Sequence, residues 1–427
     1  MDKGNYIKRP VYLQKLISRK DNGEIKVITG SRRCGKSWLL SKIYKDWLLE
    51  QGVPNECIVL ITFDADDYEE TEDISNPLVL KKYLREHITN DSEKYYVFLD
   101  EIQEVEGFEK IVNGLNKKDN VDVYLTGSNS KFLSSDLNTI FRGRSDEIRV
   151  YPLSFQEFCT NRTESINNLW KEYYTFGGLP GILRHKTPEE KTNYLQRLWN
   201  KTYIDDVVER HKVKNRQALE ALVDMLCSSI GSLTNPNKIA NTLESVQHIK
   251  VDTETINSYI GYLEDSFLFQ GAKRFNIKGK KYFESIKKYY SVDVGLRNAR
   301  LNYRQQELTH IMENVIFNEL CIRGYKVDVG VVEKREMTNG KLQYKQYEVD
   351  FIATNGIEKY YIQSAYALPD EEKREQETAS LKRIDDSFKK IIIVGDDIAM
   401  YTDENGFVFM GLLQFLTTDG NSFANAN

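Results

Sequence analysis

The segment from residue 30 to residue 37 constrains the fold of this chain more than any other. It reads Gly-Ser-Arg-Arg-Cys-Gly-Lys-Ser and lies between an apolar run at residues 25–29 and a helical pattern from Lys36 to about Glu50. Its two glycines let backbone N–H groups surround phosphate oxygens, and the dipole of the following helix favours negative charge. A strand, this loop and a helix in that order predict a phosphate-binding loop in a parallel α/β fold.

Each residue of the loop has an expected part in binding a nucleotide. We expect Lys36 to reach the terminal phosphates and the hydroxyl group of Ser37 to ligate Mg²⁺. The other residues expected to contact the nucleotide are Gly30, Ser31, Arg32, Arg33, Cys34, Gly35 and Trp38. The sequence therefore predicts a nucleoside triphosphate and Mg²⁺ as ligands.

A pair of acidic residues follows a second apolar strand. Residues 95–99 read Tyr-Tyr-Val-Phe-Leu, and Asp100 and Glu101 come next. A carboxylate at the end of a buried strand can hold Mg²⁺ or its waters, so we predict Asp100 as a metal ligand beside Ser37. Glu101 is placed to polarise an attacking water, and we predict it as a catalytic residue together with Lys36. Standing alone, the two acids would also suit a solvated strand end.

A polar segment, Thr-Gly-Ser-Asn-Ser at residues 126–130, ends a further strand pattern. Asn129 or Ser128 is a candidate for orienting the water near the γ-phosphate, and Asn129 is the predicted catalytic residue. A plain turn after a strand explains the same residues equally well.

The sequence Phe-Arg-Gly-Arg at residues 141–144 supplies two candidate arginines. Arg142 or Arg144 would stabilise transition-state charge, either from within the chain or from a neighbouring subunit. Arg144 is the predicted catalytic one, and solvated arginines are the alternative.

The length of 427 residues favours two or three domains, and changes in pattern suggest three. Residues 1–153 alternate β-type and helical runs, which predicts a parallel sheet covered by helices. Residues 154–305 are mostly helical, and residues 306–417 read as a further α/β unit. Residues 418–427 are predicted to form a disordered tail.

Composition excludes several classes of protein. Hydrophobic residues make up 40% and charged residues 29%, which is typical of a soluble globular chain. The five cysteines are scattered and form no Cys-x-x-Cys pair, which argues against disulfides or zinc and favours the cytoplasm. No run approaches the roughly 20 apolar residues that span a bilayer, so we expect no membrane partner.

One segment is strongly basic although the whole chain has a formal net charge of -5. Residues 271–304 hold ten basic and two acidic residues, a balance of +8, with aromatic residues between them. Upstream, residues 237–243 and 253–263 read as two helices in a helix-turn-helix arrangement. Double-stranded DNA is therefore a candidate partner of residues 271–304, and a packing or oligomerisation role is the alternative.

Several motifs together resemble the archaeal and bacterial predicted ATPases of the AAA superfamily. Besides the phosphate-binding loop, they are Phe-Leu-Asp-Glu-Ile-Gln (98–103), Leu-Thr-Gly-Ser-Asn-Ser (125–130), Gly-Arg (143–144), Tyr-Pro-Leu-Ser-Phe-Gln-Glu-Phe (151–158) and Gly-Gly-Leu-Pro-Gly (177–181). The resemblance implies an AAA-type core that takes ATP, then a winged-helix segment, then a C-terminal domain similar to the PD-(D/E)XK nucleases.

The resemblance also places the nuclease positions in the C-terminal segment. Glu313 and Asp350 correspond to two of the acids, whereas Gln363 and Ala365 stand where the third acid and the lysine would be. A neutral amide and a methyl group cannot do this work, so we predict a nuclease-like fold without nuclease activity. Lys359 or Lys373 could take the place of the missing lysine.

The sequence as a whole favours a Mg²⁺-dependent ATPase whose hydrolysis changes the conformation of the attached domains. A slow nucleotide-controlled switch that recruits DNA or a protein is the alternative, and an active nuclease fused to an ATPase is a third possibility. The predicted partners are ATP, double-stranded DNA and further copies of the chain.

Overall fold

A computed structural model describes residues 6–63, 73–127, 141, 143–338 and 341–418. The chain forms two compact units. The first comprises residues 1–151 with residues 265–267, and the second comprises residues 152–264 and 268–427. Each unit is described separately below.

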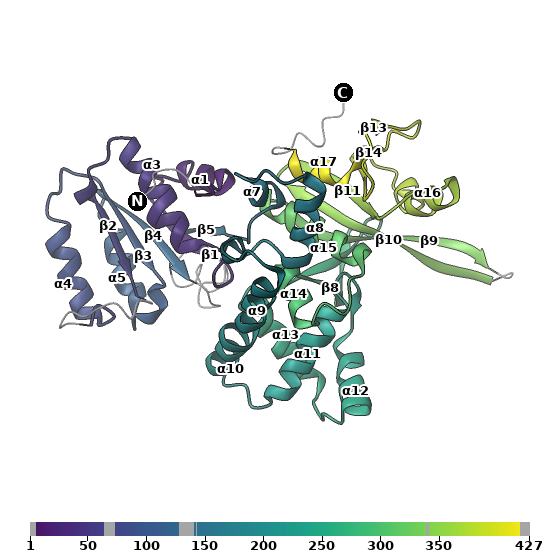
Figure 1. The fold of residues 1–427 in the computed structure, drawn as a ribbon, viewed down its shortest axis with the longest axis horizontal. Coiled ribbons are helices and arrows are strands. Elements are labelled where there is room, and N and C mark those ends of the chain that lie inside the picture. Colours follow the sequence, from purple (N-terminus) through teal and green to yellow (C-terminus); the bar gives the residue numbers. More distant parts are fainter. Residues whose placement is uncertain (1–5, 64–72, 128–140, 142, 339–340, 419–427) are drawn as a thin grey trace. The chain divides into compact units, whose positions relative to one another are not determined.

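The first unit is built on a parallel sheet of five described strands in the order β2-β3-β4-β1-β5, which confirms the predicted α/β fold (Figure 1). The strands are β1 (Ile25–Thr29), β2 (Ile58–Thr62), β3 (Tyr95–Asp100), β4 (Val121–Gly127) and β5 (Ser145–Arg149). The helices are α1 (Pro10–Ile17), α2 (Lys36–Trp38), α3 (Lys45–Glu50), α4 (Pro77–His87) and α5 (Phe108–Leu115). A π-helical segment, Leu39–Tyr44, joins α2 to α3 and completes the predicted helix after the loop.

Helices cover both faces of this sheet, so its strands are apolar on both sides. All six residues of β3 are buried. Val97 and Leu99 belong to the apolar cluster that packs with α4 and α5. Tyr96 and Phe98 belong to the cluster that packs with α1 and residues 39–48. Because the strands are parallel, β1, β3 and β4 all have their carboxyl ends on the same side of the sheet.

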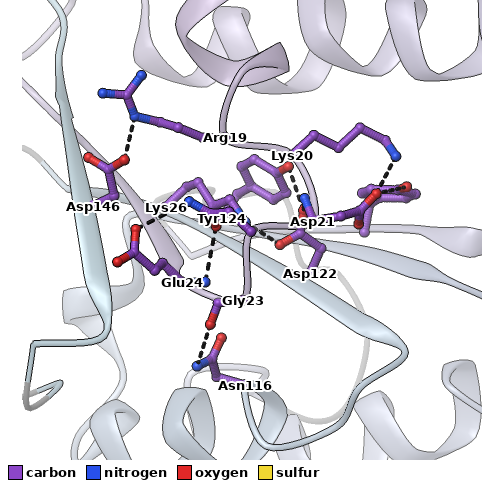
Figure 2. A network of polar contacts seen from close by, with 12 residues as sticks. Arg19, Lys20, Asp21, Gly23, Glu24, Lys26, Asn116, Asp122, Tyr124 and Asp146 are labelled. Atoms are coloured by element: carbon purple, nitrogen blue, oxygen red, sulfur yellow. Dashed lines mark hydrogen bonds and ion pairs between the residues drawn. The ribbon is translucent and has the colours of Figure 1, made fainter.

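A charged pair is buried inside this sheet. Lys26 of β1 donates a hydrogen bond to Asp122 of β4, and both side chains are almost fully buried (Figure 2). Tyr124 donates to the same carboxylate at 2.7 Å, and Asp21 donates its backbone N–H at 3.0 Å. The cation and the two further donors compensate the desolvation of the Asp122 carboxylate.

The second unit contains a mixed sheet of nine described strands in the order β13-β14-β12-β11-β10-β9-β7-β8-β6. The strands are β6 (Leu233–Thr234), β7 (Phe269–Asn276), β8 (Lys281–Ser291), β9 (Lys326–Thr338), β10 (Lys341–Asn355), β11 (Glu358–Ala365), β12 (Lys389–Val394), β13 (Tyr401–Thr402) and β14 (Val408–Gly411). The helices are α7 (Phe155–Cys159), α8 (Ile166–Phe176), α9 (Pro188–Leu198), α10 (Asp205–His211), α11 (Arg216–Ser228), α12 (Pro236–Gln247), α13 (Thr253–Asp265), α14 (Val294–Arg300), α15 (Leu308–Ile322), α16 (Glu371–Thr378) and α17 (Leu412–Thr417).

Parallel pairing of β7 with β9 makes this sheet continuous. Strands β6 to β8 come from the predicted middle segment, and strands β9 to β14 come from the predicted C-terminal segment. The predicted boundary between residues 305 and 306 therefore lies inside one compact unit. Within the part of the chain that the structure describes, every helix is too short or too polar to span a bilayer.

Asp293 links two loops of the second unit. Its carboxylate caps α14 by accepting the N–H of Leu296 at 2.9 Å, and it also accepts the N–H of Gly178 at 2.7 Å. Gly177 has a φ of 75°, and a Cβ atom there would lie 2.1 Å from the Asp293 carboxylate. The Gly-Gly-Leu-Pro-Gly motif is thus shaped around a buried aspartate.

Candidate functional site

The phosphate-binding loop has the conformation that its glycines allow. Gly30 has a φ of 143°, and a Cβ atom at this position would lie 2.2 Å from the carbonyl oxygen of Val150. Gly35 has a φ of 102° at the start of α2. Both values are strained for residues that carry a Cβ atom, so the loop requires glycine at both positions.

Lys36 lies across the loop with its ammonium group buried. The ammonium group donates to the carbonyl oxygens of Gly30 and Ser31, each at 3.0 Å. It also lies 3.9 Å from a carboxylate oxygen of Glu101. The loop therefore holds a positive charge beside its own backbone, where phosphate oxygens would bind.

Ser37 and Asp100 meet at the carboxyl ends of the parallel strands. The Ser37 hydroxyl group donates to Asp100 at 3.0 Å, and the hydroxyl group of Thr126, at the end of β4, donates to the same oxygen. Burial raises the pKa of Asp100 above that of an ordinary carboxyl group, although these two hydrogen bonds oppose the shift. A bound divalent cation would favour the ionised carboxylate.

Glu101 is held in an unusual backbone conformation. Its φ is 55°, in the left-handed region that residues other than glycine rarely adopt. Its backbone N–H donates to the Thr126 hydroxyl oxygen at 2.9 Å, and the Gln103 amide donates to its carboxylate. Strain of this kind persists only where surrounding contacts maintain it, and it is common at functional sites.

The donor set fits a magnesium nucleotide. The Ser37 hydroxyl oxygen and the Asp100 carboxylate are hard oxygen ligands of the kind that Mg²⁺ prefers. The hydroxyl group of Ser31 is buried and has no hydrogen-bond partner among the described residues. A phosphate oxygen in the loop would supply that partner. Trp38, the last residue of α2, is exposed, and the centre of its ring lies 6.2 Å from that of Tyr6.

The predicted arginine, Arg144, lies at the amino ends of the strands, opposite the phosphate-binding loop. Arg144 precedes β5, and its carbonyl oxygen accepts the N–H of Ile25 at the start of β1. The phosphate-binding loop follows the opposite end of β1, and five strand residues span about 16 Å. The backbone of Arg144 is therefore separated from the loop of its own chain by the length of β1. Asn129, Ser128 and Arg142 lie outside the described residues.

Sequence reasoning missed two residues of this site. Thr126 belongs to a motif in which only its neighbours are candidates, yet its hydroxyl group contacts Asp100 and the backbone of Glu101. Arg9 is buried and donates to the carbonyl oxygen of Cys34 in the loop at 2.9 Å. A polar residue within a buried strand pattern is the signal that could have identified Thr126, and no local pattern marks Arg9.

The two C-terminal carboxylates predicted from the nuclease resemblance, Glu313 and Asp350, lie in the second unit close to a third, Glu348. The ammonium group of Lys288, on β8, lies 3.0 Å from Glu313, 2.7 Å from Glu348 and 3.9 Å from Asp350. Asp350 accepts the backbone N–H of Ser364 at 2.8 Å. We call Glu313, Glu348 and Asp350 the carboxylate cluster.

Two pKa shifts reflect this arrangement. Burial lowers the pKa of Lys288, but the three surrounding carboxylates outweigh burial, and the net shift is upward. Burial and then the Glu313 carboxylate raise the pKa of Asp350 well above its usual value. One ammonium group cannot neutralise three carboxylates. The excess of negative charge is therefore expected to raise the pKa of Lys288 and that of Asp350.

The lysines that were candidates for the missing nuclease lysine lie elsewhere. Lys359 is 3.8 Å from Asp386, and Lys373 pairs with Glu377 at 2.6 Å. Gln363 contributes only its amide oxygen, which lies 3.4 Å from the backbone nitrogen of Asp350. In the described ranges, no group of three or more acidic, histidine or cysteine side chains is arranged to hold a metal ion.

Only some of the ten basic side chains of residues 271–304 are exposed in the structure. Lys288 is buried in the carboxylate cluster, and Arg297 is fully buried, where it donates to the carbonyl oxygen of Cys227 at 2.8 Å. Arg300 forms an ion pair with Asp224. The exposed cations of the β7–β8 hairpin are Lys273, Lys278, Lys280 and Lys281.

Matches to two family models cover much of the chain, and one of them agrees with the fold of the first unit. A family model described as an AAA domain matches residues 22–159, and a model described as a domain of unknown function matches residues 167–307. The solved structures that resemble the chain include the Aeropyrum pernix Orc1 protein in complex with DNA. It is 11% identical, covers 69% of this chain and 92% of its own, and gives a TM-score of 0.27.

A Thermotoga maritima protein related to the DNA polymerase III gamma subunit gives a similar result. It is 10% identical, covers 60% of this chain and 99% of its own, and has a TM-score of 0.27. Likenesses at this level assign no activity or partner to this chain.

Two relatives match almost the full length. An uncharacterized protein of Haemophilus influenzae is 37% identical over 394 residues, which is 91% of this chain and 93% of that protein. An uncharacterized protein of Methanocaldococcus jannaschii is 30% identical over 418 residues, 94% of this chain and 86% of that protein. The chain therefore belongs to the same family as these two bacterial and archaeal proteins, and its residues 22–159 match the AAA domain.

Proposed function

We propose that this protein binds ATP with Mg²⁺ and hydrolyses it in the first unit. In this proposal Lys36 contacts the terminal phosphates, Ser37 and Asp100 hold Mg²⁺ directly or through water, and Glu101 polarises the attacking water. Residues 30–35 and Trp38 complete the nucleotide contacts. Asn129 after β4, and Arg144 of a neighbouring copy, are the proposed further catalytic residues.

The observation that carries the proposal is the convergence of two segments at one edge of the sheet. The loop after β1 and the two acids at the end of β3 are far apart in sequence, yet Ser37 contacts Asp100 and Lys36 approaches Glu101. A metal ligand, a phosphate-binding cation and a general base are the groups that phosphoryl transfer to water needs.

We further propose that hydrolysis changes the conformation of the second unit. Helices α12 and α13 with the β7–β8 hairpin form the proposed winged helix, and the exposed lysines of the hairpin are its candidate DNA contacts. The segment from residue 306 to residue 417 is the proposed nuclease-like domain without nuclease activity. A slow nucleotide-controlled switch that recruits DNA or a protein is the second candidate.

Steady-state ATP hydrolysis tests the first step. We expect turnover that requires Mg²⁺ and that Lys36→Ala abolishes. Lys42→Ala is the matched control, because Lys42 is exposed on the π-helical segment that follows α2. Hydrolysis that survives Lys36→Ala would overturn the proposal, and nucleotide binding without turnover in the wild type would favour the switch.

Double-stranded DNA tests the second step. Lys280→Glu with Lys281→Glu should weaken DNA binding and reduce its dependence on salt, because each lysine that contacts a phosphate releases a counterion. Lys117→Glu with Lys118→Glu makes the same charge change on exposed residues of the first unit. Equal losses in both variants would show that binding follows total charge rather than the hairpin.

A further inference from the structure

The carboxylate cluster contains a cation supplied by the chain itself. Lys288 extends from β8 to Glu313 of α15 and to Glu348 and Asp350 of β10, three elements that are distant in sequence. The Lys288 side chain is 5% exposed, and those of Glu313 and Asp350 are 10% and 12% exposed. The cation is therefore enclosed rather than solvated.

The spacing of the oxygens suits an ammonium group. The nitrogen-to-oxygen distances range from 2.7 to 3.9 Å. Oxygen ligands lie about 2.0–2.1 Å from Mg²⁺ and about 2.3–2.6 Å from Ca²⁺. The carboxylates are thus spread more widely than a bare divalent cation would hold them.

Other groups fix the cluster in this arrangement. Tyr290, two residues after Lys288 on β8, donates its hydroxyl group to Glu313 at 2.7 Å. The backbone N–H of Ser364 donates to Asp350 at 2.8 Å. Glu348 is the most exposed of the three carboxylates, with 35% of its side chain accessible. The other two carboxylates are therefore anchored, and Glu348 has the freedom to move toward a different cation.

We propose that Lys288 is the resident cation of the carboxylate cluster and takes the place that a divalent metal ion would otherwise occupy. The wild-type cluster then binds no Mg²⁺ or Mn²⁺. Removing the ammonium group leaves three carboxylates around one space, and Glu348 can close the gap to bind a hard divalent cation. The inference concerns the second unit alone and is independent of the proposed ATP hydrolysis.

Manganese binding to the full chain without nucleotide tests the proposal. We compare wild type, Lys288→Met and Lys287→Met by titration calorimetry and by the electron paramagnetic resonance of free Mn²⁺. Lys287→Met is the matched control, because Lys287 is the neighbouring lysine and lies 3.7 Å from Glu264, outside the cluster. Lys288→Met should gain one Mn²⁺ site that Lys287→Met lacks, and adding Asp350→Asn to Lys288→Met should remove it.

A folded Lys288→Met variant that binds no additional Mn²⁺ would overturn the proposal. A wild-type Mn²⁺ site that Asp350→Asn removes would overturn it as well.

Lysine reactivity gives a second measurement that does not depend on the folding of a Lys288 variant. Acylation of the wild-type chain, followed by peptide mass spectrometry, should modify Lys287 much faster than Lys288. Millimolar Mn²⁺ should leave the Lys288 rate unchanged. Acylation of Lys288 that Mn²⁺ accelerates would mean that the metal displaces the ammonium group, and it would contradict the proposal.

Discussion

The hydroxyl group of Ser37 donates a hydrogen bond of 3.0 Å to the carboxylate of Asp100, and this contact joins the phosphate-binding loop to the end of β3. Thr126 donates to the same carboxylate oxygen from the neighbouring strand β4. The carboxylate that we propose as a magnesium ligand is therefore oriented from two sides.

Thr126→Val tests the importance of this orientation. Valine preserves the shape of the side chain but removes the hydroxyl group, so Asp100 loses one of its two donors. Loss of a group that orients a metal ligand typically costs about 10–100-fold in metal affinity or activity. We expect a loss of that size in Mg²⁺-dependent ATP turnover, and Thr126→Ser should restore most of it. Equal activity in the valine and serine variants would show that the hydroxyl group is dispensable.

Lys26→Met tests the buried ion pair of the first unit. The substitution leaves the Asp122 carboxylate buried without its cation, which typically costs about 3–5 kcal/mol of stability. Combining Lys26→Met with Asp122→Asn removes the uncompensated charge, so the double variant should be more stable than Lys26→Met alone. Urea denaturation of wild type, Lys26→Met, Asp122→Asn and the double variant gives the four free energies of unfolding. A double variant that shows the sum of the two single losses would indicate that the residues do not interact.

Gly177→Ala tests the close approach of the Gly-Gly-Leu-Pro-Gly motif to Asp293. The new methyl group would lie 2.1 Å from a carboxylate oxygen in a backbone conformation with a φ of 75°. We expect a loss of more than about 3 kcal/mol in the free energy of unfolding. Gly356→Ala is the control, because Gly356 has a φ of 60° and a Cβ atom there would meet nothing within 4 Å. Only the backbone strain of about 1–2 kcal/mol should appear there.

Asp293 also predicts a dependence of stability on pH. Burial raises its pKa from 3.8 to about 6, although backbone N–H donors oppose the shift. The folded state then binds a proton more tightly than the unfolded state, so the contribution of this group is favourable at low pH and declines as the pH rises from about 4 to 6. Each pKa unit corresponds to about 1.4 kcal/mol, which gives a decline of about 3 kcal/mol.

Comparison with Asp293→Asn isolates this contribution. The difference in the free energy of unfolding between wild type and variant should fall across the same pH range. Asparagine does not titrate, and the contributions of all other titrating groups are the same in both proteins and cancel. A difference that stays constant from pH 4 to pH 7 would mean that Asp293 titrates normally in the folded state.

The convergence of the loop and the two acids could be predicted from the sequence because its determinants are local. A glycine loop between strand and helix, and two acids at the end of an apolar strand, define both halves of the candidate site. Their meeting follows from parallel strands, whose carboxyl ends share one edge. Arg144 was harder to place, because its position at the start of β5 becomes clear only once the direction of that strand relative to β1 is known.

Charge counting was less informative for the second unit. Residues 287 and 288 are adjacent lysines, but successive side chains of a strand point to opposite faces, so only one of them can face the interior. Adding up the charges along the sequence counts Lys287 and Lys288 equally. The partners of Lys288 come from α15 and β10, and nothing in the sequence around β8 indicates a contact with either.

Single-turnover ATP hydrolysis by Glu101→Gln tests the central claim most directly. Glutamine keeps the size of the side chain but cannot accept a proton from water, and loss of a general base typically slows catalysis by about 10²–10⁴-fold. We expect Glu101→Gln to bind ATP and Mg²⁺ as tightly as the wild type. It should hydrolyse the bound ATP about 10²–10⁴-fold more slowly. Hydrolysis by Glu101→Gln at the wild-type rate would contradict the assignment of Glu101 and of this edge of the sheet as the catalytic site.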